Sequence, residues 1–302
     1  MSTVSTTSSA APTTSRKAAP AAYLSLMKPH VTVMLLGVTL ASMVLATGGL
    51  PPLRLILATL TGGALAAGSA NALNCYWDRD IDRLMQRTRR RSVPAGRVAA
   101  ANALRFGLAL GVGSFLILGI FVNLLSALLA LAAILFYVCV YTMWLKRATP
   151  RNIVIGGAAG AVPVLVGWAA VTNGLGLTPL VLFLIIFLWT PPHFWALALV
   201  LRQDYARAGV PMLPVARGEH ETYRQIVRYT VILVATSLVP VVTHALGLLY
   251  LVCALALGAG LLAYAMRLAI ARRPGQAYTL FWLSNHYLAL LFAAMVVDRL
   301  LH

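Results

Sequence analysis

The sequence predicts an all-α, polytopic membrane protein. Hydrophobic residues make up 60% of the 302 residues, charged residues only 10%, and the mean hydropathy is +0.84. A soluble chain of this length does not need so much apolar surface. Apolar stretches long enough to cross a bilayer recur along the chain. We expect nine transmembrane helices, at residues 31–48, 53–76, 103–122, 124–145, 153–172, 178–201, 226–246, 248–268 and 280–298.

The chain before the first span is polar. Residues 1–22 are rich in Ser, Thr, Ala and Pro and contain no acidic residue, so we expect a disordered cytoplasmic tail. Residues 23–302 are then a single intramembrane domain. A mitochondrial presequence has a similar composition, but Pro12, Pro20 and the scarcity of arginine disfavour it.

Small residues and prolines mark several spans. Gly62-Gly63 and Gly68 in the second span, and Gly156-Gly157 in the fifth, allow helix backbones to approach closely in lipid. Pro191-Pro192 is expected to break or kink the sixth span, because neither residue has a backbone N–H to donate.

The distribution of charge fixes a topology. The formal net charge of +17 by itself would suit a nucleic-acid partner. If the N-terminus is cytoplasmic, however, all of the 24 Lys and Arg residues except Arg54 and Arg299 fall on the cytoplasmic side. This is the positive-inside pattern, and it accounts for the charge without nucleic acid. It places the C-terminus on the opposite side of the membrane.

Three of the seven acidic residues directly follow the second span, as Asp78, Asp80 and Asp82. On a helix, Asn74, Asp78 and Asp82 share one stripe, whereas Asp80 points away. Two carboxylates and an amide oxygen suit Mg²⁺, which shares its oxygen ligands with substrate phosphates. The alternative is a solvated helix end, where the aspartates pair with nearby arginines: Arg79, Arg83 and Arg87.

Asp204 follows the sixth span as Asp78 follows the second, four spans earlier. This suggests two four-helix halves, each with an acidic motif after its second helix, and a ninth helix. The position four residues after Asp204 is Ala208, so the second motif has one carboxylate. Both loops are expected to face the cytoplasm, converge, and hold a diphosphate between them.

Basic residues near these motifs are candidates for binding phosphate oxygens: the run Arg89, Arg90 and Arg91, together with Lys146, Arg147 and Arg207. Topology and lipid headgroups are sufficient reason for most cytoplasmic arginines. His193 lies inside the sixth span beside the proline pair. A polar residue at membrane depth is a functional candidate, here as a contact or ligand of a bound macrocycle, although a hydrogen bond to a neighbouring helix is the simpler interpretation.

Seven motifs in the same order resemble the intramembrane polyprenyltransferases of the ubiquinone-biosynthesis type, and more specifically the protoheme IX farnesyltransferase (heme O synthase) family. The resemblance runs from about Lys28 to Asp298. The motifs are Trp77-Asp-Arg-Asp-Ile-Asp82, Arg87-Thr-Arg-Arg-Arg91, Pro94-Ala-Gly-Arg97, Tyr141-Thr-x-Trp-Leu-Lys-Arg147, Asn152-Ile-Val-Ile-Gly-Gly157, Trp189-Thr-Pro-Pro-His-Phe-Trp195 and Asp204-Tyr-x-x-Ala-Gly-x-Pro-Met-Leu-Pro214.

The resemblance implies a single nine-helix bundle with a central cavity, in the plasma membrane of a bacterium. It implies a Mg²⁺-dependent prenyltransferase that moves farnesyl from farnesyl diphosphate to a vinyl group of heme B, giving heme O, with heme A synthase as a possible downstream partner. The implied metal ligands are Asn74, Asp78, Asp82 and Asp204. The implied catalytic residues are Asp78, Asp82, Asp204 and Lys146. The implied substrate-binding residues are Asn74, Arg89, Arg147, Arg207, Tyr205 and His193.

This chain departs from the wider superfamily at Ala208, where a second carboxylate is expected, and at His30, where an arginine is expected. One competing function is prenylation of a quinone precursor such as 4-hydroxybenzoate, which would use the same diphosphate site. The competitors from other classes are a secondary transporter and a heme chaperone. A transporter usually places carboxylates near the membrane midplane, and a chaperone has no need of two facing acidic motifs.

Overall fold

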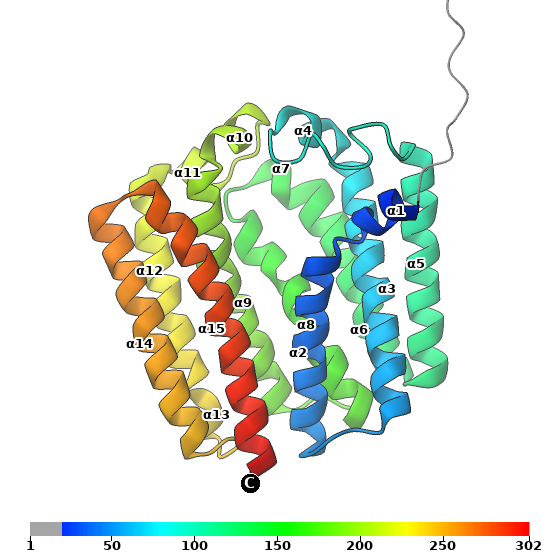
Figure 1. Ribbon diagram of the computed structural model, residues 1–302, viewed down its shortest axis with the longest axis vertical. Coiled ribbons are helices and arrows are strands. Elements are labelled where there is room, and N and C mark those ends of the chain that lie inside the picture. The colour runs from blue at the N-terminus through cyan, green and yellow to red at the C-terminus, as the bar shows by residue number, and fades with distance from the viewer. Residues whose placement is uncertain (1–19, 302) are drawn as a thin grey trace, which may run out of the picture.

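The computed structural model describes residues 20–301, and in that range helices are joined by turns and loops, without strands (Figure 1). The helices are α1 (Pro20–Leu26), α2 (Pro29–Thr47), α3 (Leu53–Trp77), α4 (Arg79–Leu84), α5 (Ala100–Phe121), α6 (Leu124–Leu135), the π-helix η1 (Phe136–Leu145), α7 (Lys146–Ala148), α8 (Asn152–Thr172), α9 (Leu177–Val200), α10 (Arg202–Arg207), α11 (Leu213–Ala216), α12 (Gly218–Ser237), α13 (Val239–Val242), α14 (Leu248–Ala271) and α15 (Pro274–Leu301).

Nine helical segments of the described chain are long and apolar enough to cross a membrane, and they match the nine predicted spans in order. The prediction of a polytopic all-α bundle is therefore confirmed. The seventh segment begins at Gly218, earlier than the predicted residue 226, because a polar turn with Glu219 and Glu221 precedes its apolar part.

The prolines of the sixth span do not interrupt it. Pro191 and Pro192 lie inside α9, which is continuous from Leu177 to Val200. The prediction of a break is therefore wrong, and the alternative of a kink stays a prediction. Thr190 uses its hydroxyl to donate to the carbonyl of Ile186, 2.9 Å away, so the turn before the prolines keeps a side-chain hydrogen bond. Loss of backbone donors in a transmembrane helix is tolerated where such local bonds and neighbouring helices compensate.

Residues 1–19 of the predicted tail lie outside the described residues. Residues 20–22, which were also predicted to belong to the disordered tail, form the start of α1 instead. Ala22 and Leu26 of α1 are buried against Ala72 and Cys75 of α3, and this burial gives the short helix its place.

Small residues bring the helices together, as predicted. A Cβ on Gly167 of α8 would collide with the backbone carbonyl of Thr39 on α2. Beside this contact, the Ser42 hydroxyl of α2 donates to the Val164 carbonyl of α8 at 2.7 Å. The bundle places α4, α7, α10 and α11 together at one end, and the end of α15 lies at the other (Figure 1).

Candidate active site

The first acidic motif keeps its helical stripe although the helix changes at its centre. Asp78 ends α3, and α4 begins at the next residue. The amide of Asp78 still donates to the Asn74 carbonyl at 2.9 Å, and the amide of Asp82 donates to the Asp78 carbonyl at 2.8 Å. These three side chains therefore point to one side and are buried, whereas the side chain of Asp80 is 58% exposed. The predicted stripe is confirmed.

Asp78 is the most enclosed carboxylate of the motif. Its Oδ2 accepts from the Lys146 ammonium at 2.5 Å and from the Asn74 amide at 2.7 Å. Its Oδ1 is buried without a hydrogen-bond partner among the described residues, and the Arg147 guanidinium lies 4.0 Å away. A buried carboxylate oxygen without a donor is costly unless a cation satisfies it.

Two further cations approach the stripe from other parts of the chain. The guanidinium of Arg91 binds both oxygens of Asp82, at 3.1 and 2.9 Å. The ammonium of Lys28 donates to the Asn74 amide oxygen at 3.1 Å. Burial lowers the pKa of Lys28 to about 8, and Lys28 itself has a left-handed backbone, φ 50°, which is uncommon for a residue with a Cβ.

The π-helix η1 positions Thr142, and the residue directly after it, Lys146, beside the stripe. The fourth span changes from α-helix to π-helix at Phe136 and returns to α-helix at Lys146. Thr142 from η1 accepts from the Asn74 amide at 3.2 Å, and Lys146 follows directly. Single-turn π-segments recur at functional sites because they re-aim side chains. The sequence contained no pattern that predicts this one.

The second acidic motif meets the first, as predicted. The backbone N–H of Arg87 donates to Asp204 Oδ2 at 3.2 Å, which links the loop after α4 to α10. Arg207 lies 3.5 Å from the other oxygen of Asp204. Beneath this link a buried apolar cluster joins the two loops, made of Ile81, Met85, Ile153, Ala198, Tyr205, Ala208, Val210 and Met212. Ala208 thus serves as a packing residue.

The nearby arginines do not take the pairs that the alternative interpretation gave them. Arg79 bonds to the Tyr76 carbonyl at 2.7 Å and stacks on the Tyr76 ring. Asp80 is bound by Arg147 through two hydrogen bonds of 2.7 Å, which lower the pKa of the Asp80 carboxyl to about 2. Asp78 and Asp80 are therefore paired with Lys146 and Arg147, distant in sequence, and Asp82 with Arg91 of the following loop.

Two predicted substrate-binding residues lie away from the aspartates' contacts. Arg89 is exposed, and its side chain makes no hydrogen bond or ion pair within residues 20–301. His193 is buried in α9 and is bonded to Ser284 of α15 at 2.7 Å. Their roles stay predictions. Sequence reasoning missed Lys28 and Thr142, and it did not single out Arg91 from the run of three arginines.

The donor set fits Mg²⁺ as a group that shares its ligands with a substrate. Among the described residues no three His, Cys, Asp or Glu side chains converge as a metal site. The buried, unsatisfied Oδ1 of Asp78 and the adjoining Asn74 and Asp82 instead offer a partial set of oxygen ligands. Mg²⁺ is commonly held in this way, by one or two carboxylates together with phosphates and water.

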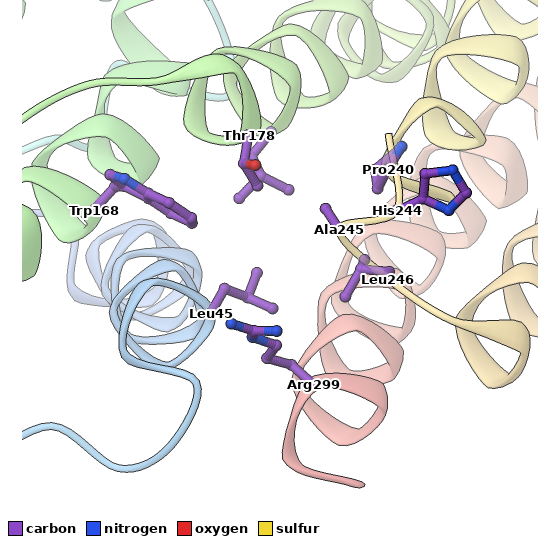
Figure 2. Close-up of a pocket in the computed structure, with 9 residues that line it drawn as sticks. Leu45, Trp168, Thr178, Pro240, His244, Ala245, Leu246 and Arg299 are labelled. Atoms are coloured by element: carbon purple, nitrogen blue, oxygen red, sulfur yellow. The ribbon is translucent and has the colours of Figure 1, made fainter. Parts of the chain in front are cut away.

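A cavity of about 250 Å³ opens at the other end of the bundle from α4 and α10 (Figure 2). Its walls come from α2, α8, α9, α13, α15 and the loop after α13, and include Leu45, Trp168, Leu182, Leu246 and Arg299. This cavity is distinct from the acidic motifs, so the predicted central cavity beside the aspartates stays a prediction.

The sequence profile of the UbiA prenyltransferase family matches residues 35–292. The chain belongs to the UbiA prenyltransferase family. The match covers the acidic stripe, the π-helix and Asp204, so this UbiA member carries its two motifs inside the family domain.

Several curated relatives of this UbiA member bear one name. A protoheme IX farnesyltransferase of Gloeobacter violaceus is 54% identical over 279 residues, covering 92% of each chain. One from Synechocystis sp. is 55% identical over 282 residues, covering 92% of this chain and 89% of the relative. One from Roseiflexus sp. is 54% identical over 280 residues, and here the chain spans about half the relative's length, 52%.

Solved structures share the fold at low sequence identity. A digeranylgeranylglyceryl phosphate synthase aligns with a TM-score of 0.78 and 18% identity, over 93% of this chain and 99% of the other. A UbiA homologue from Archaeoglobus fulgidus bound to GPP and Mg²⁺ aligns with a TM-score of 0.60 and 16% identity, over 91% and 99%. The UbiA fold is thus shared across family members with little sequence identity.

Proposed function

We propose that this UbiA-family prenyltransferase transfers farnesyl from farnesyl diphosphate to a vinyl group of heme B, forming heme O and diphosphate. The acceptor and donor are those in the name of the relatives that are 54–55% identical over most of this chain. The observation that carries the chemistry is the buried stripe of Asn74, Asp78 and Asp82 with Lys146 and Arg91 bound to it. A hydrogen bond to Asp204 joins the loop after α4 to the second acidic motif.

The cations are placed to bind a diphosphate. Lys146 and Arg91 are held by buried carboxylates, so their charge is fixed at the mouth of the bundle. Arg207, beside Asp204, is 49% exposed and faces the solvent from which a diphosphate would enter. Guanidinium groups bind phosphate oxygens through two parallel hydrogen bonds, and an ammonium acts as a point charge.

Asn74, Asp78 and Asp82 would hold one Mg²⁺ and Asp204 a second, and the bound metal would supply positive charge to the leaving diphosphate. The reaction breaks the bond between C1 of the farnesyl group and the diphosphate oxygen, and the electron pair leaves with the diphosphate. Lys146, Arg91 and Arg207 stabilise the negative charge that grows on that oxygen.

The vinyl π electrons of heme B then form the new carbon–carbon bond to C1. The cation that remains beside the porphyrin is captured by a water oxygen, which loses one proton. The apolar cluster under the two loops, with Ile81, Met85 and Tyr205, keeps water from the allylic cation before that bond forms.

We further propose that the protein lies in a bacterial plasma membrane with the α4 and α10 end in the cytoplasm and the C-terminus on the opposite side. The basic residues gather at the α4 and α10 end, and Arg299 lies at the other. A heme A synthase would be the partner that consumes heme O.

The test uses purified protein with heme B and farnesyl diphosphate, with Mg²⁺ or with a chelator, and identifies the porphyrins by mass spectrometry. We expect a chelator-sensitive product heavier by one farnesyl and one hydroxyl group. Prenylated 4-hydroxybenzoate without a heme product would replace the acceptor and keep the diphosphate site. A product that is insensitive to the chelator would refute the role of the metal.

A further inference from the structure

His193 is fixed on three sides between α9 and α15. Its ring stacks on Trp189 with centroids 4.2 Å apart and on Phe281 with centroids 4.4 Å apart, at interplanar angles of 22° and 27°. Its Nδ1 lies 2.7 Å from the Ser284 hydroxyl. Two stacked faces and one hydrogen bond leave the imidazole without rotational freedom.

The hydrogen bonds of Ser284 determine which ring nitrogen carries the proton. The Ser284 hydroxyl donates to the Phe281 carbonyl at 2.8 Å. A hydroxyl has a single proton to donate, so when it donates to Phe281 its oxygen accepts from His193. The proton of a neutral His193 is therefore on Nδ1, and Nε2 carries an unshared electron pair.

Nε2 of His193 is free to bind. No described residue donates a hydrogen bond to it, and it is not one of the fully buried polar atoms that lack a partner in that part of the chain. Some access to it thus remains, although the residue as a whole is 5% exposed. An imidazole donating its other N–H to a fixed oxygen is the usual arrangement of a metal-ligating histidine.

The position of His193 relative to the acidic motif suits a large substrate. Leu201 joins α9 to α10: its amide donates to the Leu197 carbonyl, and its carbonyl accepts from the Tyr205 amide. Asp204, in α10, is eleven residues after His193, a helical rise of about 16 Å. A ligand held at His193 can extend from α9 toward the diphosphate site.

We propose that Nε2 of His193 is an axial ligand of the iron of the heme substrate, and that Ser284 is the positioning residue that fixes its tautomer. The identity of the metalloporphyrin rests on the proposed function, whereas the ligand geometry rests on α9 and α15 alone. Trp189 and Phe281 keep the ring pointed in one direction.

The first experiment adds ferric heme B to the full-length protein in detergent and records its absorption and electron paramagnetic resonance spectra. We expect the signature of histidine ligation in the wild type. His193→Gly should lose it, and added imidazole should restore it. His286→Ala is the matched control. His286 is an exposed histidine on α15, the helix of Ser284, and among the described residues it bonds only to the Trp282 carbonyl. Its spectrum should remain that of the wild type.

The second experiment tests the tautomer. Ser284→Ala removes the acceptor of Nδ1–H. We expect heme affinity to fall about 10-fold, since a residue that accepts the other ring N–H of a ligating histidine contributes about 10–100-fold to metal affinity. Ser284→Thr keeps the hydroxyl and should restore both affinity and spectrum. This pair remains informative if His193→Gly fails to fold. Thermal unfolding of each variant separates loss of ligation from loss of structure.

Metal-free protoporphyrin IX distinguishes ligation from simple contact. The inference holds if His193→Gly weakens heme binding and leaves metal-free porphyrin binding unchanged. Equal loss of both, an unchanged heme spectrum in His193→Gly, or a wild-type spectrum without nitrogen ligation overturns it. Histidine-ligated heme without farnesyl transfer would refute the proposed function and support the ligand role of His193. Farnesyl transfer without histidine ligation would support the proposed function and refute the ligand role.

Discussion

The ion pair between Asp78 and Lys146 allows stability and activity to be separated. Asp78 is fully buried and the Lys146 side chain is 13% exposed, with 2.5 Å between Oδ2 and Nζ. Asp78→Asn keeps the shape and an amide oxygen for Lys146 but removes the charge. The double variant Asp78→Asn/Lys146→Met removes both charges and keeps the volume.

The single variant leaves the Lys146 ammonium largely buried beside a neutral amide. Breaking a fully buried pair costs about 3–5 kcal/mol, and losing a charged hydrogen bond costs about 1.5–3 kcal/mol. Because the amide still accepts and Lys146 has some access to water, we expect a cost of about 2–3 kcal/mol. The double variant should recover most of this, since replacing both partners of a buried pair is often neutral.

Activity should behave differently. Loss of one charge-stabilising group at a developing oxyanion lowers kcat by about 10²–10³-fold. We expect a loss of at least that size in Asp78→Asn and no recovery in the double variant. Thermal unfolding in detergent gives the stability, and turnover of farnesyl diphosphate with heme B gives the activity.

Asp80→Asn is the matched control, since Asp80 is two residues away, 58% exposed and paired with Arg147. An exposed pair contributes about 0–1 kcal/mol, so its stability should be near that of the wild type. The reasoning is refuted if the double variant regains turnover together with stability, or if Asp80→Asn loses as much activity as Asp78→Asn.

Asp204→Asn should retain the bond from the Arg87 amide, so the two loops stay joined while turnover falls about 10²-fold. An Asp204→Leu variant also loses the acceptor and should unfold at a lower temperature than Asp204→Asn. Equal unfolding temperatures of the two variants would contradict the link between the loops. Gly167→Ala should lower stability by about 1–3 kcal/mol because its methyl meets the Thr39 backbone on α2. Gly160→Ala, on the same helix α8 with nothing within 4 Å, should be neutral, and thermal unfolding of the pair decides the point.

The spans follow from local sequence because a bilayer selects long apolar helices regardless of what they pack against. The stripe of Asn74, Asp78 and Asp82 follows from the helical period alone, and its hydrogen bonds persist across the change from α3 to α4. The meeting of the two loops that carry Asp78 and Asp204 could also be predicted, since both loops follow spans that end at the same end of the bundle.

The tertiary structure alone decided which cations meet which carboxylates. Lys28, Arg91 and Lys146 reach the stripe from α2, from the loop after α4 and from the end of the π-helix, and nothing in their spacing distinguishes them from other basic residues. The same holds for the serine that fixes His193, 91 residues further along the chain. Periodicity determines which residues share a face of one helix, whereas a contact between helices depends on how their surfaces pack, and packing is a property of the whole bundle.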